Sequence, residues 1–296
     1  MSLSTPAFAL VRAPIAPMQA EPRVSSAQVS QTLFGHAPTV VERSGDWHRI
    51  RTLDGYEGWT HAGYLAVLDA PLPLALSAAT VRALGGGEAA ATSEANGLAK
   101  HAGTYDAERL AALLAEDAVP RVSLGCTVIA GDRKMRLPVG AWVHGPQTLL
   151  EGEAVALDEM AERFPRDPDM IVRSLRLFEG TSYQWGGLTP WGADCSGLVQ
   201  SVFGMHGVAL PRDAWQQASA GHDVGSDIQA LEPADLLFFS DRDDRRITHV
   251  GVALGGGRMA HLALGRGGWA ADDLGDADDP YCATLAARFV GARRVL

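Results

Sequence analysis

The residue best suited to carry out chemistry is a cysteine that lies between a glycine-rich stretch and an apolar run. The glycine-rich stretch is Tyr183–Gly187, and Cys195 follows a few residues later, directly after Asp194. The residues after Cys195 are apolar at helical spacing, so we expect the cysteine at a helix N-terminus. Backbone N–H groups and the helix dipole there stabilise a thiolate, the nucleophilic form of cysteine. Cys195 is therefore the candidate nucleophile.

Two histidines could activate this thiol, because a cysteine with an ordinary pKa of about 8.5 needs a base at neutral pH. His249 opens the apolar run at 250–254, and an imidazole there can accept the thiol proton and later protonate a leaving amine. His261 lies in the next apolar run, across the Gly255–Gly257 turn, and antiparallel pairing can bring it beside His249. A neighbour that accepts a hydrogen bond from His249 would fix its tautomer.

Each of these residues also has a structural interpretation. A cysteine in apolar surroundings is commonly a small buried hydrophobe, and a histidine at a strand end commonly satisfies the backbone. The order and spacing of Cys195, His249 and His261 together favour catalysis over these separate interpretations.

The elements that would hold this set have recognisable patterns. Residues 169–178 predict a helix, with Met170, Ile171, Leu175 and Phe178 facing inward. The helix that begins at the cysteine should end at Gly204 or Gly207. Three apolar runs predict central strands of an antiparallel sheet, at 236–239, 250–254 and 259–262. A helix before a sheet, with the nucleophile on the helix, is an α+β papain-like layout.

The N-terminal part is predicted to be β-rich. Short strands at 39–43, 47–51 and 57–60, separated by glycine-containing turns, suggest a small barrel. A proline-rich link at 70–73 leads to a second β-type region at about 78–150, with a Gly/Ala/Ser stretch at 85–104 and a helix near 106–116.

The two β-type regions end in similar residues. Gly58–Ala62 resembles Ala141–Gly145, which indicates two related SH3-like barrels or, alternatively, a coincidence between two strand ends. We therefore predict three domains, at 1–70, 71–157 and 158–296.

Composition excludes several classes of protein. The chain has 296 residues, a net charge of −10 and 47% hydrophobic residues, which argues against disorder and nucleic-acid binding. Cys126, Cys195 and Cys282 are widely separated, so neither structural zinc nor a disulfide framework is expected. We expect no metal, no cofactor, no membrane span and a monomer. The N-terminus shows no signal peptide, which predicts a cytoplasmic protein; an exported protein whose leader is missing is the alternative.

Residues 169–265 resemble the NlpC/P60 family of cysteine peptidases, which act on bacterial cell-wall peptides. The matching motifs are Tyr183-x-Trp185-Gly186-Gly187, Asp194-Cys195-Ser196-Gly197-Leu198, Leu210-Pro211-Arg212, Ala234-Asp235-Leu236-Leu237-Phe238-Phe239, His249-Val250-Gly251-Val252 and His261. The resemblance implies that Cys195 is the nucleophile, His249 its base and His261 the residue that orients His249.

The N-terminal part resembles the first bacterial SH3 domain of three-domain γ-D-glutamyl-diamino acid endopeptidases, at Gln31–Gly35, Gly45–Trp47 and Asp54–Trp59. This implies hydrolysis of the γ-D-glutamyl bond to diaminopimelate or lysine in peptides with a free N-terminal L-alanine. The resemblance places Tyr56 at the ligand. It places a further set of residues in the cleft: Tyr183, Trp185, Asp194, Ser196, Arg212 and Asp213.

These site residues have structural alternatives. Tyr56 could be a surface tyrosine at a strand end, Asp194 could cap the helix, and Arg212 with Asp213 could be a solvated ion pair. Trp47, Trp59 and Trp142 are expected in barrel cores. The chain also departs from the pattern of the subgroup, with Ala27 in place of an acidic residue, Ala214 in place of serine or threonine, and Ala234 in place of glycine.

The expected chemistry is amide hydrolysis through an acyl-enzyme on Cys195. The oxyanion would be held by the Cys195 backbone N–H, with the Tyr183 hydroxyl as a second donor. Two alternatives remain open. One is a wall-peptide binding module whose peptidase domain is silent, and the other is an amidase or acyltransferase that uses the same thiol.

Overall fold

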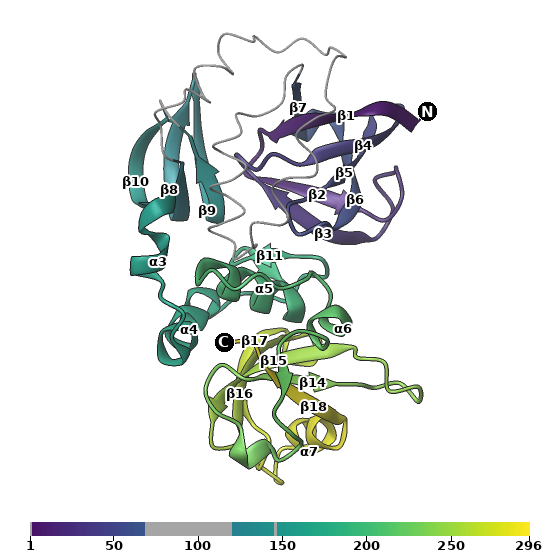
Figure 1. The fold of residues 1–296 in the computed structure, drawn as a ribbon, viewed down its shortest axis with the longest axis vertical. Helices are drawn as coiled ribbons and strands as arrows, with labels where there is room; N and C mark the ends of the chain where they lie inside the picture. Colours follow the sequence, from purple (N-terminus) through teal and green to yellow (C-terminus); the bar gives the residue numbers. More distant parts are fainter. Residues whose placement is uncertain (1, 69–119, 145–146) are drawn as a thin grey trace. The chain divides into compact units, whose positions relative to one another are not determined.

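The computed structural model describes residues 2–68, 120–144 and 147–296, and from Ala9 onward it also describes their side chains (Figure 1). The chain forms two compact units, Met1–Arg163 and Phe164–Leu296. The helix predicted near 106–116 and the Gly/Ala/Ser stretch lie outside the described residues. The domain boundaries at 70 and 157 stay predictions.

The first unit opens with a seven-stranded antiparallel sheet. Its strand order is β3-β2-β6-β5-β4-β1-β7, and a 3₁₀ turn at Ala62–Tyr64 precedes the last strand. The strands predicted at 39–43, 47–51 and 57–60 are confirmed, whereas the others carried no clear pattern. The strands are β1 (Ser2–Val11), β2 (Ile15–Gln19), β3 (Gln28–Leu33), β4 (Thr39–Ser44), β5 (Trp47–Arg51), β6 (Glu57–His61) and β7 (Leu65–Leu68).

This sheet is held by alternating apolar residues on its inner face. Val40 on β4 pairs with Ile50 on β5, and both side chains are fully buried. Gly45 joins the two strands with a positive φ of 56°, a conformation that glycine adopts without a steric penalty. The cluster comprises Ala9, Val11, Ala16, Met18, Val40, Ile50 and Leu65.

A second antiparallel sheet in the same unit has the strand order β10-β8-β9, formed by β8 (Arg121–Ala130), β9 (Arg133–Val143) and β10 (Thr148–Ala156). It packs against the end of β3, where the backbone N–H of Trp142 donates to the Phe34 carbonyl at 2.8 Å. His36 Nε2 donates to the Gly140 carbonyl at 2.9 Å, and His144 Nε2 donates to the Gly35 carbonyl at 2.8 Å. Short helical turns, at Leu157–Glu159 and α3 (Met160–Arg163), end the unit.

The second unit has the expected α+β layout. Its main sheet has the order β13-β18-β14-β15-β16-β17, with antiparallel neighbours throughout. These strands are β13 (His222–Asp223), β14 (Leu236–Phe239), β15 (His249–Gly255), β16 (Arg258–Ala263), β17 (Gly268–Asp273) and β18 (Phe289–Arg294). The short strands β11 (Leu188–Thr189) and β12 (Gly192–Ala193) pair beside it.

Helices cover both faces of this sheet. They are α4 (Pro168–Ser174), α5 (Cys195–Met205), α6 (Ala214–Gln217) and α7 (Pro280–Ala287), with 3₁₀ turns at Leu175–Phe178, Ile228–Ala230 and Leu264–Arg266. Within residues 2–68, 120–144 and 147–296, no helix is long and apolar enough to cross a membrane.

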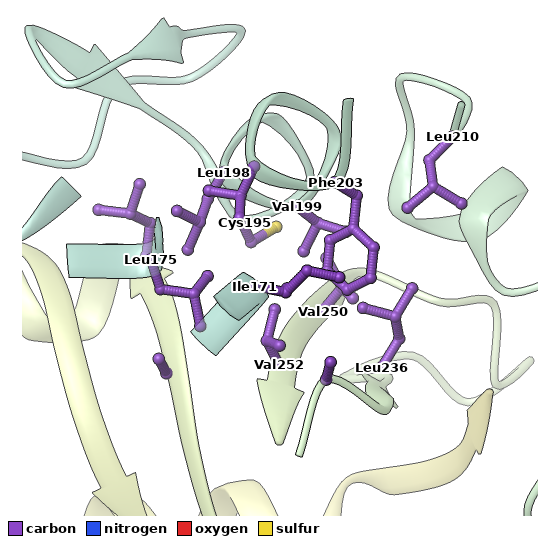
Figure 2. Close-up of a cluster of buried hydrophobic side chains, with 14 of the residues drawn as sticks. Ile171, Leu175, Cys195, Leu198, Val199, Phe203, Leu210, Leu236, Val250 and Val252 are labelled. Carbon is purple, nitrogen blue, oxygen red and sulfur yellow. The ribbon is translucent and has the colours of Figure 1, made fainter. Parts of the chain in front are cut away.

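Alternation along β14 explains how the sheet is buried on two faces. Leu236 and Phe238 belong to the cluster that contains the residues of α5, and Leu237 and Phe239 belong to the cluster that contains Leu285 of α7. Successive side chains of a strand point to opposite faces, so one fully apolar strand serves both cores. Figure 2 shows Cys195 at the start of α5 within the first of these clusters, near Val250.

The predicted helices differ from the observed ones at their ends. The helix predicted at 169–178 continues only to Ser174, after which a 3₁₀ turn carries buried Leu175 and Phe178. Helix α5 ends at Met205, and Gly207 follows with a φ of 70°, so Gly207 rather than Gly204 is the glycine that ends it.

Two glycines of α5 offer a matched test of this packing. A Cβ at Gly197 would lie 2.0 Å from the Gly187 carbonyl oxygen, whereas a Cβ at Gly204 meets no described atom within 4 Å. We expect Gly197→Ala to destabilise the protein by about 1–3 kcal/mol through overpacking. Gly204→Ala should instead raise the stability by up to about 1 kcal/mol, because alanine favours helix. Chemical denaturation measures both; equal effects would contradict this account of α5.

The first unit should lose stability in mild acid. Burial, with a smaller contribution from His144, lowers the pKa of His36 from 6.5 to about 4. The unfolded chain therefore binds a proton that the folded state does not as pH falls from 6.5 to 4, and stability falls over that window. We expect His36→Gln, which keeps an N–H donor for the Gly140 carbonyl, to flatten the pH dependence of the unfolding free energy. The exposed His222→Gln is the control, and an equal flattening there would refute the assignment.

Candidate active site

The thiol of Cys195 sits at the first residue of α5. Asp194 caps the helix by accepting the Gly197 N–H at 2.7 Å. The backbone N–H groups of Val250 and Ser196 face the sulfur and favour its thiolate form. Burial, and secondly the Asp194 carboxylate, outweigh them and raise the thiol pKa to about 12. The resting thiol is therefore protonated, and it lies against the backbone of the residue that follows His249.

The two candidate histidines meet across the β15–β16 hairpin. His249 Nε2 lies 2.7 Å from His261 Nδ1, and the ring centroids are 5.0 Å apart. Since Nε2 of His249 is engaged by His261, Nδ1 is the ring nitrogen of His249 that could accept a proton. Burial, and secondly the neighbouring His261, lower the pKa of His249 to about 3, so the imidazole is neutral at rest. A neutral imidazole can accept the proton of a neutral thiol.

Sequence reasoning missed a carboxylate behind the second histidine. His261 Nε2 lies 2.9 Å from Asp272 Oδ2, and Arg266 Nη2 lies 3.0 Å from Asp272 Oδ1. Strand β17 pairs Ala270 opposite His261, so Asp272, two residues on, lies on the same face. The pattern of residues 268–273 after the Leu264–Gly267 turn would have indicated this strand.

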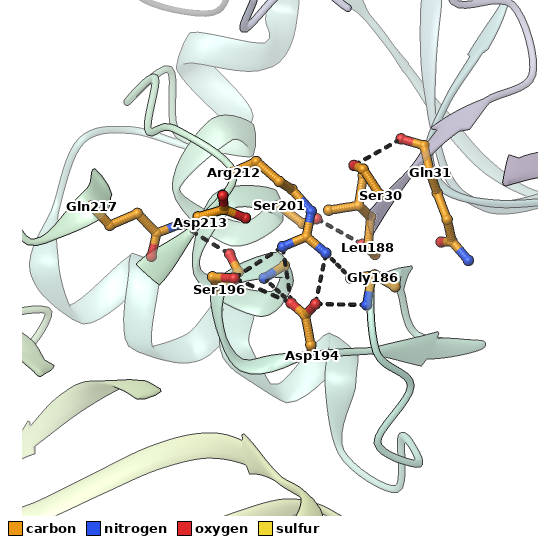
Figure 3. Close-up of polar contacts among 12 residues, drawn as sticks. Ser30, Gln31, Gly186, Leu188, Asp194, Ser196, Ser201, Arg212, Asp213 and Gln217 are labelled. Carbon is orange, nitrogen blue, oxygen red and sulfur yellow. Dashed lines mark hydrogen bonds and ion pairs between the residues drawn. The ribbon is translucent and has the colours of Figure 1, made fainter. Parts of the chain in front are cut away.

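Three of the predicted cleft residues form a buried cluster beside the cysteine (Figure 3). Arg212, only 1% exposed, binds Asp194 in a bidentate pair, with Nη1 to Oδ1 at 3.0 Å and Nη2 to Oδ2 at 2.7 Å. Ser196 Oγ accepts from Arg212 Nη1 at 2.9 Å. The expected alternative, a solvated pair between Arg212 and Asp213, is wrong, because the guanidinium is buried against Asp194.

The Asp194 carboxylate is fully engaged by this cluster. Its Oδ1 accepts from the Gly197 N–H and Arg212, and its Oδ2 accepts from the Gly186 N–H at 2.8 Å and Arg212. Asp194 therefore holds the glycine turn and the helix start together, as well as capping α5. Contact of Asp194, Ser196 or Arg212 with a substrate stays a prediction.

The glycine turn before the cysteine positions two aromatic residues. Tyr183 donates its N–H to the Gly267 carbonyl at 3.0 Å and packs half-buried against the core of the unit. Burial, with Cys195 and Asp194 nearby, raises the pKa of Tyr183, so its hydroxyl keeps its proton as a hydrogen-bond donor. Trp185 is 65% exposed. A Cβ at Gly187 would lie 2.3 Å from the Gly192 carbonyl oxygen, so the turn requires glycine there.

The two remaining predicted site residues lie at the starts of elements. Asp213 is the N-cap of α6, and its carboxylate accepts from Trp215 Nε1 at 3.2 Å. Tyr56 belongs to the first unit, where it precedes β6 and packs partly buried against the barrel core. The ligand contacts of both residues stay predictions.

One group of described residues has the donor types of a metal site. Asp272, Asp279 and Cys282 present ligand atoms within 4.8 Å of one another. Arg266 already pairs with both carboxylates and lies 3.5 Å from the Cys282 sulfur. A guanidinium thus supplies the positive charge of this cluster.

Comparison with known proteins gives two family matches. Residues 180–277 match the NlpC/P60 family, and residues 18–66 match a bacterial SH3 domain. The chain is 42% identical over 92 residues to a gamma-D-glutamyl-L-lysine dipeptidyl-peptidase of Bacillus subtilis, which covers 31% of this chain and 30% of the relative. It is 25% identical over 250 residues to the protein of the same name from Bacillus cereus, which covers 78% of this chain and 66% of the relative.

The fold has a counterpart over nearly its whole length. The crystal structure of an NlpC/P60 family protein from Bacillus cereus aligns with 98% of this chain and 99% of its own, with a TM-score of 0.67 and 17% identity. The chain spans only 30% and 66% of the length of the two curated relatives. The family matches identify its domains, and the structural match identifies its fold. The chain carries an NlpC/P60 family domain, and a bacterial SH3 domain precedes it in the sequence.

Proposed function

We propose that this protein is an active cysteine peptidase that hydrolyses the γ-D-glutamyl bond to a diamino acid in peptides derived from peptidoglycan. The proposal rests on one arrangement: the Cys195 thiol at the start of α5 lies against the backbone of Val250, and the residue before Val250, His249, pairs with His261 at 2.7 Å. The names of the two Bacillus relatives, both gamma-D-glutamyl-L-lysine dipeptidyl-peptidases, support the substrate class.

The proposed chemistry follows from the arrangement of donors. The Cys195 sulfur attacks the γ-carbonyl carbon, a C–S bond forms, and the thiol proton passes to His249 Nδ1. The backbone N–H of Cys195 and the Tyr183 hydroxyl stabilise the oxyanion. The C–N bond then breaks, and the imidazolium gives its proton to the leaving amine. Water cleaves the thioester with His249 again as the base, which releases the glutamyl carboxylate and restores the thiol.

The proposed substrate carries a free N-terminal L-alanine, and its third residue is diaminopimelate or lysine. Tyr56 of the SH3 domain is the proposed contact for this N-terminal alanine. The resting carboxylate of Asp194 is occupied by Arg212, so binding of a substrate ammonium by Asp194 would require it to share that partner. The proposed setting is the cytoplasm, where such peptides would be recycled.

The proposal predicts a defined product. Incubation with L-Ala-γ-D-Glu-L-Lys or L-Ala-γ-D-Glu-meso-diaminopimelate should release the free diamino acid, measured by mass spectrometry. Cys195→Ala should lose at least about a thousand-fold in rate, because the nucleophile is gone. Cys126→Ala is the control and should keep the activity. N-acetylated peptides should react slowly if the free amine is recognised. A reduced protein that releases no diamino acid from either peptide would reject the proposal.

A wall-peptide binding module with a silent peptidase domain is the second candidate. The observation that favours it is the burial of Cys195, which is 6% exposed and has a raised pKa. An amidase or acyltransferase that uses the same thiol is distinguished by its products alone.

Alkylation separates an active thiol from a silent one. We expect iodoacetamide to label Cys195 faster than Cys126 or Cys282 near neutral pH, because Cys195 begins helix α5 and its sulfur lies against Val250, the residue after the paired His249. Peptide mapping by mass spectrometry gives the three rates in one experiment. Labelling of Cys195 no faster than that of Cys126 would favour the binding module.

A further inference from the structure

We propose that Asp272 is a positioning residue for the catalytic histidines: it fixes the tautomer of His261, and through His261 it leaves His249 Nδ1 free to act as the base. The inference rests on the proposed function, since it assumes that His249 serves the Cys195 thiol. It adds to the expected set of Cys195, His249 and His261 a carboxylate that sequence reasoning did not include.

The direction of each proton follows from the donors and acceptors in the chain of contacts. An ionised carboxylate only accepts hydrogen bonds, so at 2.9 Å from Asp272 the Nε2 of His261 must carry a proton. In a neutral ring, Nδ1 of His261 then has a lone pair. The 2.7 Å contact to His249 needs one donor, and only His249 Nε2–H can supply it. Nδ1 of His249 is left with its lone pair.

Burial makes this arrangement hard to reverse. His261 is 0% exposed and Asp272 is 8% exposed, so water has little access to replace a lost partner. The opposite tautomer of His261 would set a lone pair against the carboxylate and an N–H against the N–H of His249. A buried donor or acceptor without a partner destabilises the folded state, and here two hydrogen bonds would be lost at once.

Arg266 keeps the carboxyl group of Asp272 ionised. Its Nη2 lies 3.0 Å from Oδ1 of Asp272, and its Nε lies 3.2 Å from Oδ2. Burial alone would raise the pKa of Asp272, but the hydrogen bonds from His261 and Arg266 outweigh it and hold the pKa below its usual value. Arg266 is held in turn by Asp279 and by the ring of Tyr281, 4.3 Å away.

The same carboxylate has a second effect during the reaction. When the thiol proton reaches His249, the histidine pair carries a positive charge next to Asp272, and this attraction stabilises the imidazolium. The charge acts through His261, because His261 is the histidine that Asp272 contacts. Its removal should therefore change the rate of the chemical step more than substrate binding.

Asp279 provides a matched control. It pairs with the same Arg266 but makes no contact with either histidine, and asparagine can keep its role as the N-cap of α7. We expect Asp272→Asn to lower kcat about 10- to 100-fold with KM nearly unchanged, less than the loss of about 10⁴ seen when a carboxylate directly on a catalytic histidine is replaced. Asp279→Asn should stay within about twofold of the wild type.

The pH profile separates positioning from a merely structural role. Without the carboxylate the histidine pair protonates at lower pH, so the acidic limb of kcat/KM should move to lower pH in Asp272→Asn and stay in place in Asp279→Asn. The pH dependence of Cys195 alkylation by iodoacetamide should move in the same direction, and it needs no substrate. Identical profiles for the two variants would overturn the proposal.

The tautomers of both histidines can be determined directly in the wild-type protein. Nitrogen-15 chemical shifts of the histidine rings should show His261 protonated on Nε2 and His249 also protonated on Nε2. His261 protonated on Nδ1 would overturn the proposal even if Asp272→Asn failed to fold. The expected tautomers in a protein that cleaves no wall peptide would support the role of Asp272 and reject the proposed substrate, so the two failures are distinguishable.

Discussion

The buried ion pair between Asp194 and Arg212 is the interaction on which the catalytic end of the second unit depends. The Asp194 carboxylate accepts hydrogen bonds from N–H groups of both the glycine turn and the first turn of α5. The Arg212 guanidinium donates to the Ser196 hydroxyl and the Gly187 carbonyl. A buried pair of this kind is costly to desolvate and costlier still to break, because either partner alone would be an uncompensated charge. The pair therefore holds the glycine turn before Cys195 and the first turn of α5 after it in one fixed arrangement.

The sheet supplies the other half of the site by simple alternation. Val250 and Val252 pack in the same core as the residues of α5, and the backbone N–H of Val250 faces the Cys195 sulfur. Met259 contributes to the opposite core, and His261 lies on the same face as Met259, near Tyr281 of α7. The NlpC/P60 domain thus uses one face of its strands to pack the nucleophile and the other to hold the charge network behind the histidines.

The sequence allowed the local elements of the second unit to be predicted, but not its long-range partners. Apolar runs identified β14, β15 and β16 because their residues are buried on both faces. Asp272 was missed because its role depends on the pairing of β16 with β17, a register that no local pattern specifies. Ala234 stands where the family pattern has glycine, and its φ of 69° shows the reason for that preference, since glycine adopts this conformation without strain. Asp194 was expected either as a ligand contact or as a helix cap; the cap is observed.

The junction between the SH3 domain and the sheet of β8, β9 and β10 has a consequence for folding. His36 and Gly140 are 104 residues apart in sequence, yet they share a hydrogen bond, and Leu33 and Phe34 belong to the same core cluster as Val128 and Leu137. A chain cut at residue 70 would leave Leu33, at the end of β3, and the adjacent Phe34 without their partners from β8 and β9. Contacts between such distant segments slow folding, since a long loop must close before they form. We therefore expect the first unit to fold late and as one cooperative body, only after residues beyond 140 have been synthesised.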